Sequence, residues 1–149
     1  MKSEPDCYSI DDLIAAGGPA MWEGCRNYTV RNSFRDLMSP GDMAFFYHST
    51  RAPVGIVGTM EIVGEAYPDP TQFDPSSDYY DPKSPRESPR WLVRDVVFRE
   101  RFLRTVPLSE LRGVPGLEGC AVLQRGQRLS VMPITAAEWA IIDGLEGLR

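Results

Sequence analysis

The sequence predicts an α+β domain, built on a strongly bent sheet or small barrel with helices at its periphery. Its 149 residues match the size of one compact domain, and no repeat or linker divides them, so we expect one domain over residues 1–149. Runs of apolar and β-branched residues typical of antiparallel strands are mixed with short amphipathic helices. The content of 42% apolar and 25% charged residues is ordinary for a globular protein.

Three helices have recognisable starts. Ser9 followed by Asp12, and Thr135 followed by Glu138, match the capping box of helix N-termini. Asn27 is a candidate cap for another helix. The first helix should end at Gly17-Gly18. The apolar face of the Asn27 helix is expected to consist of Val30, Phe34, Leu37 and Met38.

Strands are predicted at residues 43–47 and 54–63, as an antiparallel pair joined by a polar loop. Residues 91–98 predict a third strand, bulged near Glu100 and continuing to Val106. Residues 2–8 predict a short strand or sheet edge. A short helical turn is expected at residues 108–111.

The segment 67–90 holds six prolines and four aromatic side chains. A loop this long inside a compact domain is uncommon and often functional. Its aromatic residues predict that it packs on the domain. Its aspartates match no calcium loop and are explained by turn chemistry, so no metal site is predicted.

Composition excludes several classes of protein. No apolar run approaches the ~18 residues of a membrane span, and the N-terminal residues do not resemble a signal peptide, so we expect a cytoplasmic protein. Three cysteines without Cys-x-x-Cys spacing, and a single histidine, argue against a disulfide framework and a metal site. The net charge of −5 argues against non-specific nucleic-acid binding. However, residues 83–128 carry 10 basic and 5 acidic groups, and arginine suits bidentate phosphate contact.

A catalytic pair is one hypothesis. Cys25 and His48, with Asp42 to orient the histidine, are a possible nucleophile and base. No nucleophile-elbow motif surrounds them, and a cysteine is often only a small buried residue. The preferred interpretation of His48 is a structural or ligand-contacting residue at the end of a strand.

Aromatic recognition is the better-supported hypothesis. Trp22 lies in a polar stretch between two predicted helices, where a core plug and a stacking platform are equally reasonable. Trp91 opens a strand after the proline-rich segment, which favours core packing. Trp139 lies on an apolar helix face and is interpreted as core.

Motifs along nearly the whole chain resemble the EVE-domain family. The matching stretches are residues 2–5, 8–13, 22–28, 31–32, 41–42, 45–49, 55–58, 66–69, 80–83, 91–97 and 129–131, with Pro133 and Trp139. The family usually has valine at the position of Cys25, and it usually begins a few residues before the position of Met1. The second difference predicts a clipped first strand around Lys2 and Ser3.

The resemblance implies a PUA-like fold, related to the YTH domains that read methylated adenine in RNA. It implies a small curved β-barrel of about five to six mostly antiparallel strands with flanking helices. It also implies a pocket for one modified base, a cytosine such as 5-methylcytosine or 5-hydroxymethylcytosine, in DNA or RNA. No enzymatic activity is implied.

A base reader stacks on the faces of an extruded base and bonds its edge. Trp22 and Trp91 are therefore expected as walls, and polar side chains as edge contacts. Helix capping by Asn27 is an equal alternative to ligand contact, and Asn32 can instead lie on a solvated helix face. The predicted pocket consists of Lys2, Ser3, Trp22, Asn27, Tyr28, Asn32, Tyr47, His48, Ser49 and Trp91. The predicted phosphate contacts are Arg26, Arg31, Arg35, Arg86 and Arg90.

We accordingly expect a monomer that binds nucleic acid carrying a modified base, without cofactor, metal or membrane. The alternative is a small-molecule or protein-interaction domain that uses the aromatic loop to dock a partner. A Cys25/His48 hydrolase is the lesser alternative.

Overall fold

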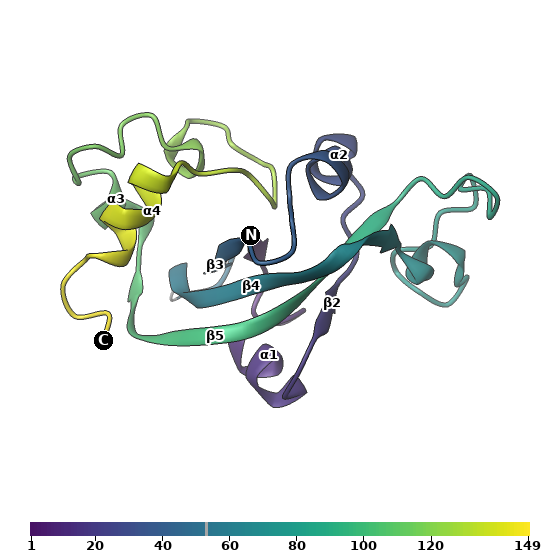
Figure 1. The fold of residues 1–149 in the computed structure, drawn as a ribbon, viewed down its shortest axis with the longest axis horizontal. Helices are drawn as coiled ribbons and strands as arrows, with labels where there is room; N and C mark the ends of the chain where they lie inside the picture. Colours follow the sequence, from purple (N-terminus) through teal and green to yellow (C-terminus); the bar gives the residue numbers. More distant parts are fainter. Residues whose placement is uncertain (53) are drawn as a thin grey trace.

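The computed structural model describes residues 1–52 and 54–149, and its centre is a five-stranded sheet (Figure 1). The strand order is β1-β3-β4-β5-β2; β1 runs parallel to β3 and the other pairs are antiparallel. The strands are β1 (Lys2–Ser3), β2 (Ala20–Trp22), β3 (Met43–His48), β4 (Gly55–Pro68) and β5 (Leu92–Val106). The α-helices are α1 (Ile10–Ala16), α2 (Tyr28–Asp36), α3 (Leu108–Leu111) and α4 (Ala136–Asp143).

The predicted α+β class is confirmed, but the barrel is not closed. The edge strands β1 and β2 are not paired with each other in the described part of the chain. The long strands β4 and β5 bend because their pairing shifts register at several points, one of them at the predicted bulge near Glu100. Gly58 lies at this point, and a Cβ there would be 2.2 Å from the Glu100 carbonyl oxygen, so the two backbones can approach only without a side chain.

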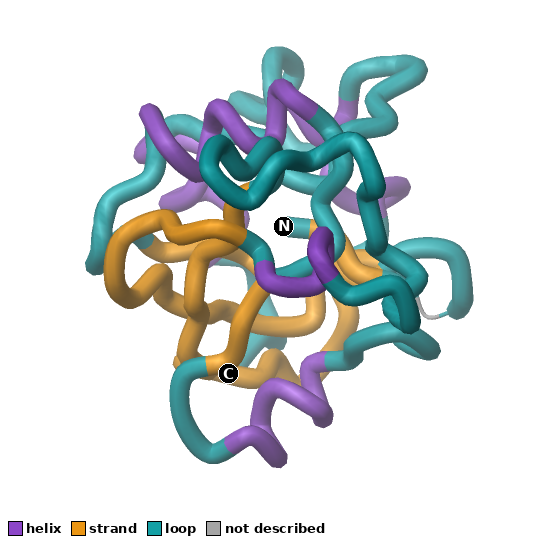
Figure 2. The backbone as a smooth tube through the Cα atoms, turned by 90° about the vertical axis from the view of Figure 1, so that its right-hand side faces the viewer, coloured by secondary structure: helices purple, strands orange, loops and turns teal. Residues whose placement is uncertain are grey.

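The sheet separates two apolar cores, because successive side chains of a strand point to opposite faces. Phe46 packs with α1 and α2 residues in one core, while Phe45 and Tyr47 pack with α3 and α4 residues in the other. Figure 2 shows helices on more than one side of the strands.

The predicted helix starts are confirmed. Both capping boxes form, and the Asn27 side chain accepts hydrogen bonds from the backbone N–H groups of Thr29 and Val30. Leu37 is wrong as a core position, because α2 ends at Asp36 and Leu37 is 68% exposed. The predicted strand at residues 2–8 is shorter, and β2 was not expected, since its three residues are too few to give a pattern.

The end of α2 is held by a buried arginine on β5. Arg94 is 1% exposed and donates hydrogen bonds to the carbonyl oxygens of Phe34, Met38 and Gly64 at 2.5–2.8 Å. The bonds to Phe34 and Met38 satisfy carbonyls that the end of α2 leaves without partners. Arg94 therefore fixes the end of α2 against the sheet. Its own position on β5 pairs with Trp22 of β2.

Candidate functional site

A cavity of about 500 Å³ opens between the first strand, the segment around β2 and the proline-rich loop. We call it the Trp22 cavity. It is lined by residues from five separate stretches of the chain: residues 2–4, 7–8 and 20–26, with Tyr79 and Ser130. Its volume lies within the range of small-ligand sites in proteins.

Aromatic rings form the walls of the Trp22 cavity. Trp22 is 6% exposed and is backed by Phe46, whose ring centroid lies 5.3 Å away at an interplanar angle of 75°. The Tyr8 ring meets Trp22 edge-on at 6.3 Å. Tyr79 reaches in from the proline-rich loop and lies directly over Gly24, where a Cβ would be 2.5 Å from the ring. Gly24 also has a φ of +81°, so both the conformation and the Tyr79 contact require glycine.

A buried carboxylate fixes the floor of the cavity. Asp69 is fully buried and accepts hydrogen bonds from Gly24 N at 3.1 Å, Arg26 Nη1 at 2.7 Å and the Thr71 hydroxyl at 2.5 Å. Burial alone would raise the pKa of Asp69, but the bonds from Thr71, Arg26 and Gly24 together lower its pKa below the usual value. Asp69 thus joins the residue 23–27 loop to the proline-rich loop through an ionised group.

The proline-rich loop is itself folded around one buried amide. Gln72 Nε2 donates to the carbonyl oxygens of Asp69 and Trp91, and Gln72 Oε1 accepts from the Ser84 hydroxyl and from Trp91 N. All four hydrogen-bonding positions of the amide are used. This packing confirms the expectation that the loop lies on the domain, and it explains how Tyr79 is held in place.

Glu23 and Cys25 are two of the titratable groups that line the cavity with shifted pKa values. Burial raises the pKa of Glu23, with a further rise from nearby Asp69 and a partial offset from Arg26. Burial raises the pKa of the Cys25 thiol to about 11, and its Sγ lies 3.9 Å from the Ser130 hydroxyl. At neutral pH the cavity therefore presents a partly desolvated carboxyl group and a protonated thiol.

The structure brings together only part of the predicted pocket. Lys2, Ser3 and Trp22 line the Trp22 cavity, and so does Arg26. Trp91 does not, because its indole Nε1 donates to Asp81 at 2.7 Å while its ring packs against Tyr28. The expected pair of facing tryptophan walls is therefore not formed, and Tyr28 belongs to the Trp91 cluster.

The predicted edge-binding asparagines have other partners. Asn27 is occupied with capping α2, as its alternative interpretation predicted. Asn32 Oδ1 accepts from Arg31 Nε at 3.0 Å on the side of α2. Neither residue lines the Trp22 cavity.

The β3 residues face elsewhere as well. Tyr47 is 5% exposed and packs in the apolar core on the other side of the sheet from the core that contains Trp22. His48 Nε2 accepts a hydrogen bond from the first N–H of α1, Ile10 N, at 3.1 Å, and burial lowers the pKa of this imidazole. Ser49 N donates to the Ser3 carbonyl oxygen and so ties the first strand to β3. His48 therefore makes a structural contact, which is one of the two roles that the sequence left open.

These contacts do not fit the Cys25/His48 hydrolase. The thiol is paired with Ser130, and the imidazole nitrogen that a base would use is already bonded to the backbone of α1. A thiol with a raised pKa is a weak nucleophile at neutral pH.

Most predicted phosphate contacts are engaged within the protein. Arg26 is bonded to Asp69, Thr71 and the Tyr79 carbonyl oxygen, and its guanidinium lies within 6 Å of the centroids of both the Tyr79 and the Trp91 rings, at 5.6 and 5.7 Å. The other four are exposed or half-buried: Arg31 lies over Tyr28, Arg35 pairs with Asp36, Arg86 lies over Phe73 and Arg90 is 3.9 Å from Asp81.

A second cavity of about 540 Å³ lies on the other side of Lys2, between β3 and α4. We call it the Trp139 cavity, since Trp139 stacks there on Phe45 at 3.9 Å. Its lining is mostly apolar and includes Met1, Met38, Met43 and Met132. Among residues 1–52 and 54–149, no helix could cross a bilayer and no group of three or more His, Cys, Asp or Glu could hold a metal ion.

Comparison with known proteins assigns the chain to a family. The family model for the EVE domain matches residues 1–145. The chain belongs to the EVE domain family. This membership confirms the resemblance drawn from the sequence motifs.

Named relatives match along almost the whole chain. Mouse "Thymocyte nuclear protein 1" is 44% identical over 98% of this chain and 72% of that protein. A Pseudomonas syringae protein of known structure is 47% identical with a TM-score of 0.90, covering 95% of this chain and 94% of that one. The human THYN1 protein, solved "in complex with 5-methylcytosine containing DNA", is 41% identical with a TM-score of 0.87, covering 95% of this chain and 92% of that one.

Proposed function

We propose that this EVE domain binds nucleic acid by taking one modified cytosine, foremost 5-methylcytosine, into the Trp22 cavity. The observation that carries the proposal is the cavity itself, which has aromatic walls, a desolvated carboxyl group and a floor fixed by buried hydrogen bonds. The 41% identity to a human protein solved with 5-methylcytosine-containing DNA supports the choice of base.

Stacking supplies affinity for any base. Contact of a base with aromatic rings is worth roughly 1–3 kcal/mol, and every base has two faces to offer. Trp22, Tyr8 and Tyr79 provide rings around one space. Because Phe46 backs Trp22 and Gly24 backs Tyr79, these rings are held in place before the ligand arrives.

Edge contacts supply the choice of cytosine. Cytosine offers an exocyclic amine, and a carboxylate is the usual protein acceptor for it. Glu23 is the candidate acceptor, since its desolvation strengthens any hydrogen bond it accepts. The hydroxyls of Ser3 and Ser130 are placed to contact the polar ring atoms.

Selectivity for the methyl group should be modest. One methyl group in an apolar contact is worth about 1–3 kcal/mol of discrimination at most. Cys25 lies in the cavity as a small apolar surface with a protonated thiol. We therefore expect a preference for 5-methylcytosine over cytosine of about tenfold to a hundredfold.

The proposal keeps Lys2, Ser3 and Trp22 from the sequence-based pocket and adds Tyr8, Glu23 and Tyr79. It describes a reader without catalysis. Binding to RNA, the monomeric state and the cytoplasmic location stay predictions; the vertebrate relatives carry the word "nuclear" in their name.

The test is a binding panel of short, otherwise identical DNA and RNA strands carrying cytosine, 5-methylcytosine, 5-hydroxymethylcytosine or N6-methyladenine. We expect the wild-type protein to prefer a modified cytosine. Glu23→Gln should weaken that complex about tenfold, because a bond to a charged acceptor becomes a bond to a neutral one. Equal affinity of the wild-type protein for all strands would overturn the proposal.

A further inference from the structure

The acidic chain carries few basic side chains that are free to meet a phosphate. In the described part of the chain, nine of the 14 arginines lie within 4 Å of a carboxylate oxygen. Arg125 and Arg128 are among the exposed arginines that form no ion pair or side-chain hydrogen bond with any described residue. An unpaired arginine does not have to break an ion pair within the protein in order to bind an external anion.

Both arginines lie on the stretch that leads to Ser130, which lines the Trp22 cavity. Ser130 lines the cavity, and its carbonyl oxygen accepts a hydrogen bond from Lys2 N at 2.7 Å, which attaches this stretch to the first strand. Arg128 is two residues before Ser130, within about 7 Å along the backbone. Lys2, which donates this hydrogen bond from the first strand, also lines the cavity.

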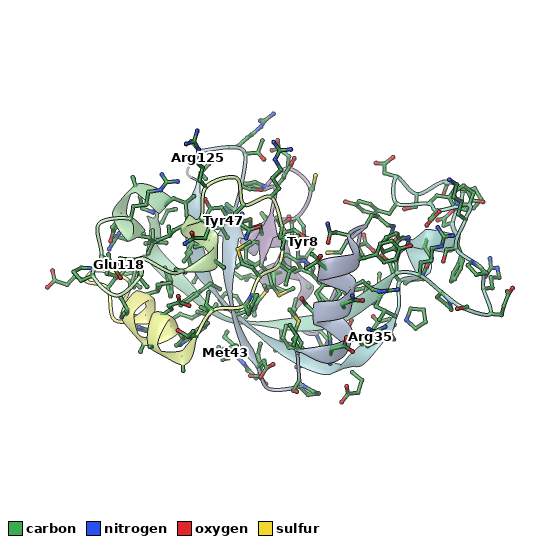
Figure 3. All side chains as sticks on the ribbon, turned by 90° about the horizontal axis from the view of Figure 1, so that it is seen from above. Tyr8, Arg35, Met43, Tyr47, Glu118 and Arg125 are labelled. Carbon is green, nitrogen blue, oxygen red and sulfur yellow. The ribbon has the colours of Figure 1, made fainter. Side chains whose placement is uncertain are left out.

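Arg125 is presented outward by a tight turn. The turn is closed by a hydrogen bond from Gln127 N to the Gln124 carbonyl oxygen at 3.2 Å, and Gly126 supplies the positive φ of 76° that it requires. In Figure 3 Arg125 projects away from the ribbon, while Arg35 on α2 lies on the opposite side of the molecule. Arg125 and the paired Arg35 therefore lie on different sides of the molecule.

We propose that Lys2, Arg125 and Arg128 bind the phosphates that flank the base held in the Trp22 cavity, so that the nucleic-acid backbone follows the edge formed by residues 124–130. This inference rests on the proposed function. It assigns phosphate contact to residues other than the arginines predicted from the sequence, which were Arg26, Arg31, Arg35, Arg86 and Arg90.

The negative charge of the protein makes local cations necessary for binding a nucleic acid. The protein has a net charge of −5, and Glu4 and Glu23 line the cavity, so an approaching polyanion is repelled unless local cations offset these charges. Each phosphate neutralised by a cation releases counterions, which makes binding weaken as salt rises.

The experiment compares two double variants that remove the same charge. Arg125→Gln with Arg128→Gln removes the free cations; Arg35→Gln with Arg99→Gln removes exposed arginines that are paired with Asp36 and Glu61. Each is titrated with a single-stranded DNA containing one 5-methylcytosine, and with its unmethylated twin, over a range of salt concentrations. Thermal unfolding confirms that each variant is folded.

The Arg125/Arg128 variant is expected to bind both strands about tenfold more weakly at low salt than wild type. The slope of log affinity against log salt should become flatter by about 0.7 for each phosphate that the variant no longer neutralises. The Arg35/Arg99 variant should keep the wild-type slope, and Arg125→Lys with Arg128→Lys should restore most of it.

An unchanged slope in the Arg125/Arg128 variant, or an equal change in the Arg35/Arg99 control, would overturn this inference. The ratio of affinities for methylated and unmethylated strands separates the two proposals. A preserved ratio with an unchanged slope overturns the phosphate assignment alone, whereas a wild-type ratio near one overturns the proposed function.

Discussion

The Trp22 cavity and the Trp139 cavity have similar volumes, about 500 and 540 Å³, and Lys2 lines both, yet they are built differently. Buried polar side chains hold the first: Asp69 and Gln72 each bond several groups from separate segments. The second is held by apolar packing, in which Phe45 stacks on Trp139 and four methionines line the space.

The difference shows why volume alone does not identify a binding site. Methionine side chains adapt to many shapes and offer no fixed donors or acceptors. A base is recognised by its edge, which requires polar atoms at fixed positions. Of the two cavities, the Trp22 cavity is the one that combines aromatic walls with such atoms.

The largest expected effect comes from breaking the polar support. Asp69→Asn should lower the free energy of unfolding by about 3 kcal/mol, because Arg26 loses its charged partner in a largely buried place. The same variant should lose most binding to a 5-methylcytosine strand, since Gly24 and Tyr79 are no longer fixed. Chemical denaturation and strand titration measure the two effects.

Acid tests the same carboxylate. The pKa of Asp69 is lowered in the folded protein, so its ionised form contributes stability above pH ~4 that is lost as the pH falls through the folded value. Asp69→Asn should therefore show a smaller acid-induced loss of stability than wild type. An identical pH profile for the two proteins would show that Asp69 is not the group responsible.

Breaking the apolar support should leave binding intact. Trp139→Ala removes the stack on Phe45 and should cost about 2 kcal/mol of stability, less than for a fully buried tryptophan because Trp139 is half-buried. The ratio of affinities for methylated and unmethylated strands should not change. A lost preference in a folded Trp139→Ala protein would move the site to the Trp139 cavity.

A smaller effect separates capping from base contact. Asn27→Ala should lower stability by about 1 kcal/mol, the usual cost of a lost helix cap, and Asn27→Asp should retain it. Neither change should alter the preference for the methylated strand. A loss of preference at wild-type stability would restore Asn27 to the pocket.

The smallest expected effect is a pH dependence of binding. Because burial raises the pKa of Glu23, the carboxylate becomes protonated at a higher pH than an ordinary glutamate, and the proposed acceptor for the cytosine amine is lost. Affinity of the wild-type protein should fall a few-fold as the pH is lowered from 7 toward 4.5, the ordinary glutamate pKa, and the fall should begin above that pH. The Glu23→Gln protein should start lower and change less over that range.

Local signals in the sequence predicted much of the fold. The capping residues Ser9, Asn27 and Thr135, the strand runs and the bulge near Glu100 depend on neighbours along the chain, and all are present. The three-residue strand β2 was missed, because it exists through its pairing with β5.

The candidate site was harder to predict for the same reason. Trp22 and Trp91 both stand beside family motifs, but only long-range contacts decide that Trp22 faces a cavity while Trp91 bonds Asp81. Asp69 and Gln72 looked like ordinary residues of a proline-rich loop, and their role depends on partners up to 45 residues away. A buried polar network of this kind leaves no periodic signal in a single sequence.

The most direct measurement places the modified base beside Trp22. In a protein carrying Trp91→Phe and Trp139→Phe, Trp22 is the remaining tryptophan of the three and reports on the cavity alone. Titration with a 5-methylcytosine strand should quench its fluorescence saturably, with the same midpoint as an independent binding assay, and the unmethylated strand should need a higher concentration. Full-affinity binding with unchanged Trp22 emission would contradict the account, because the base would then be bound elsewhere.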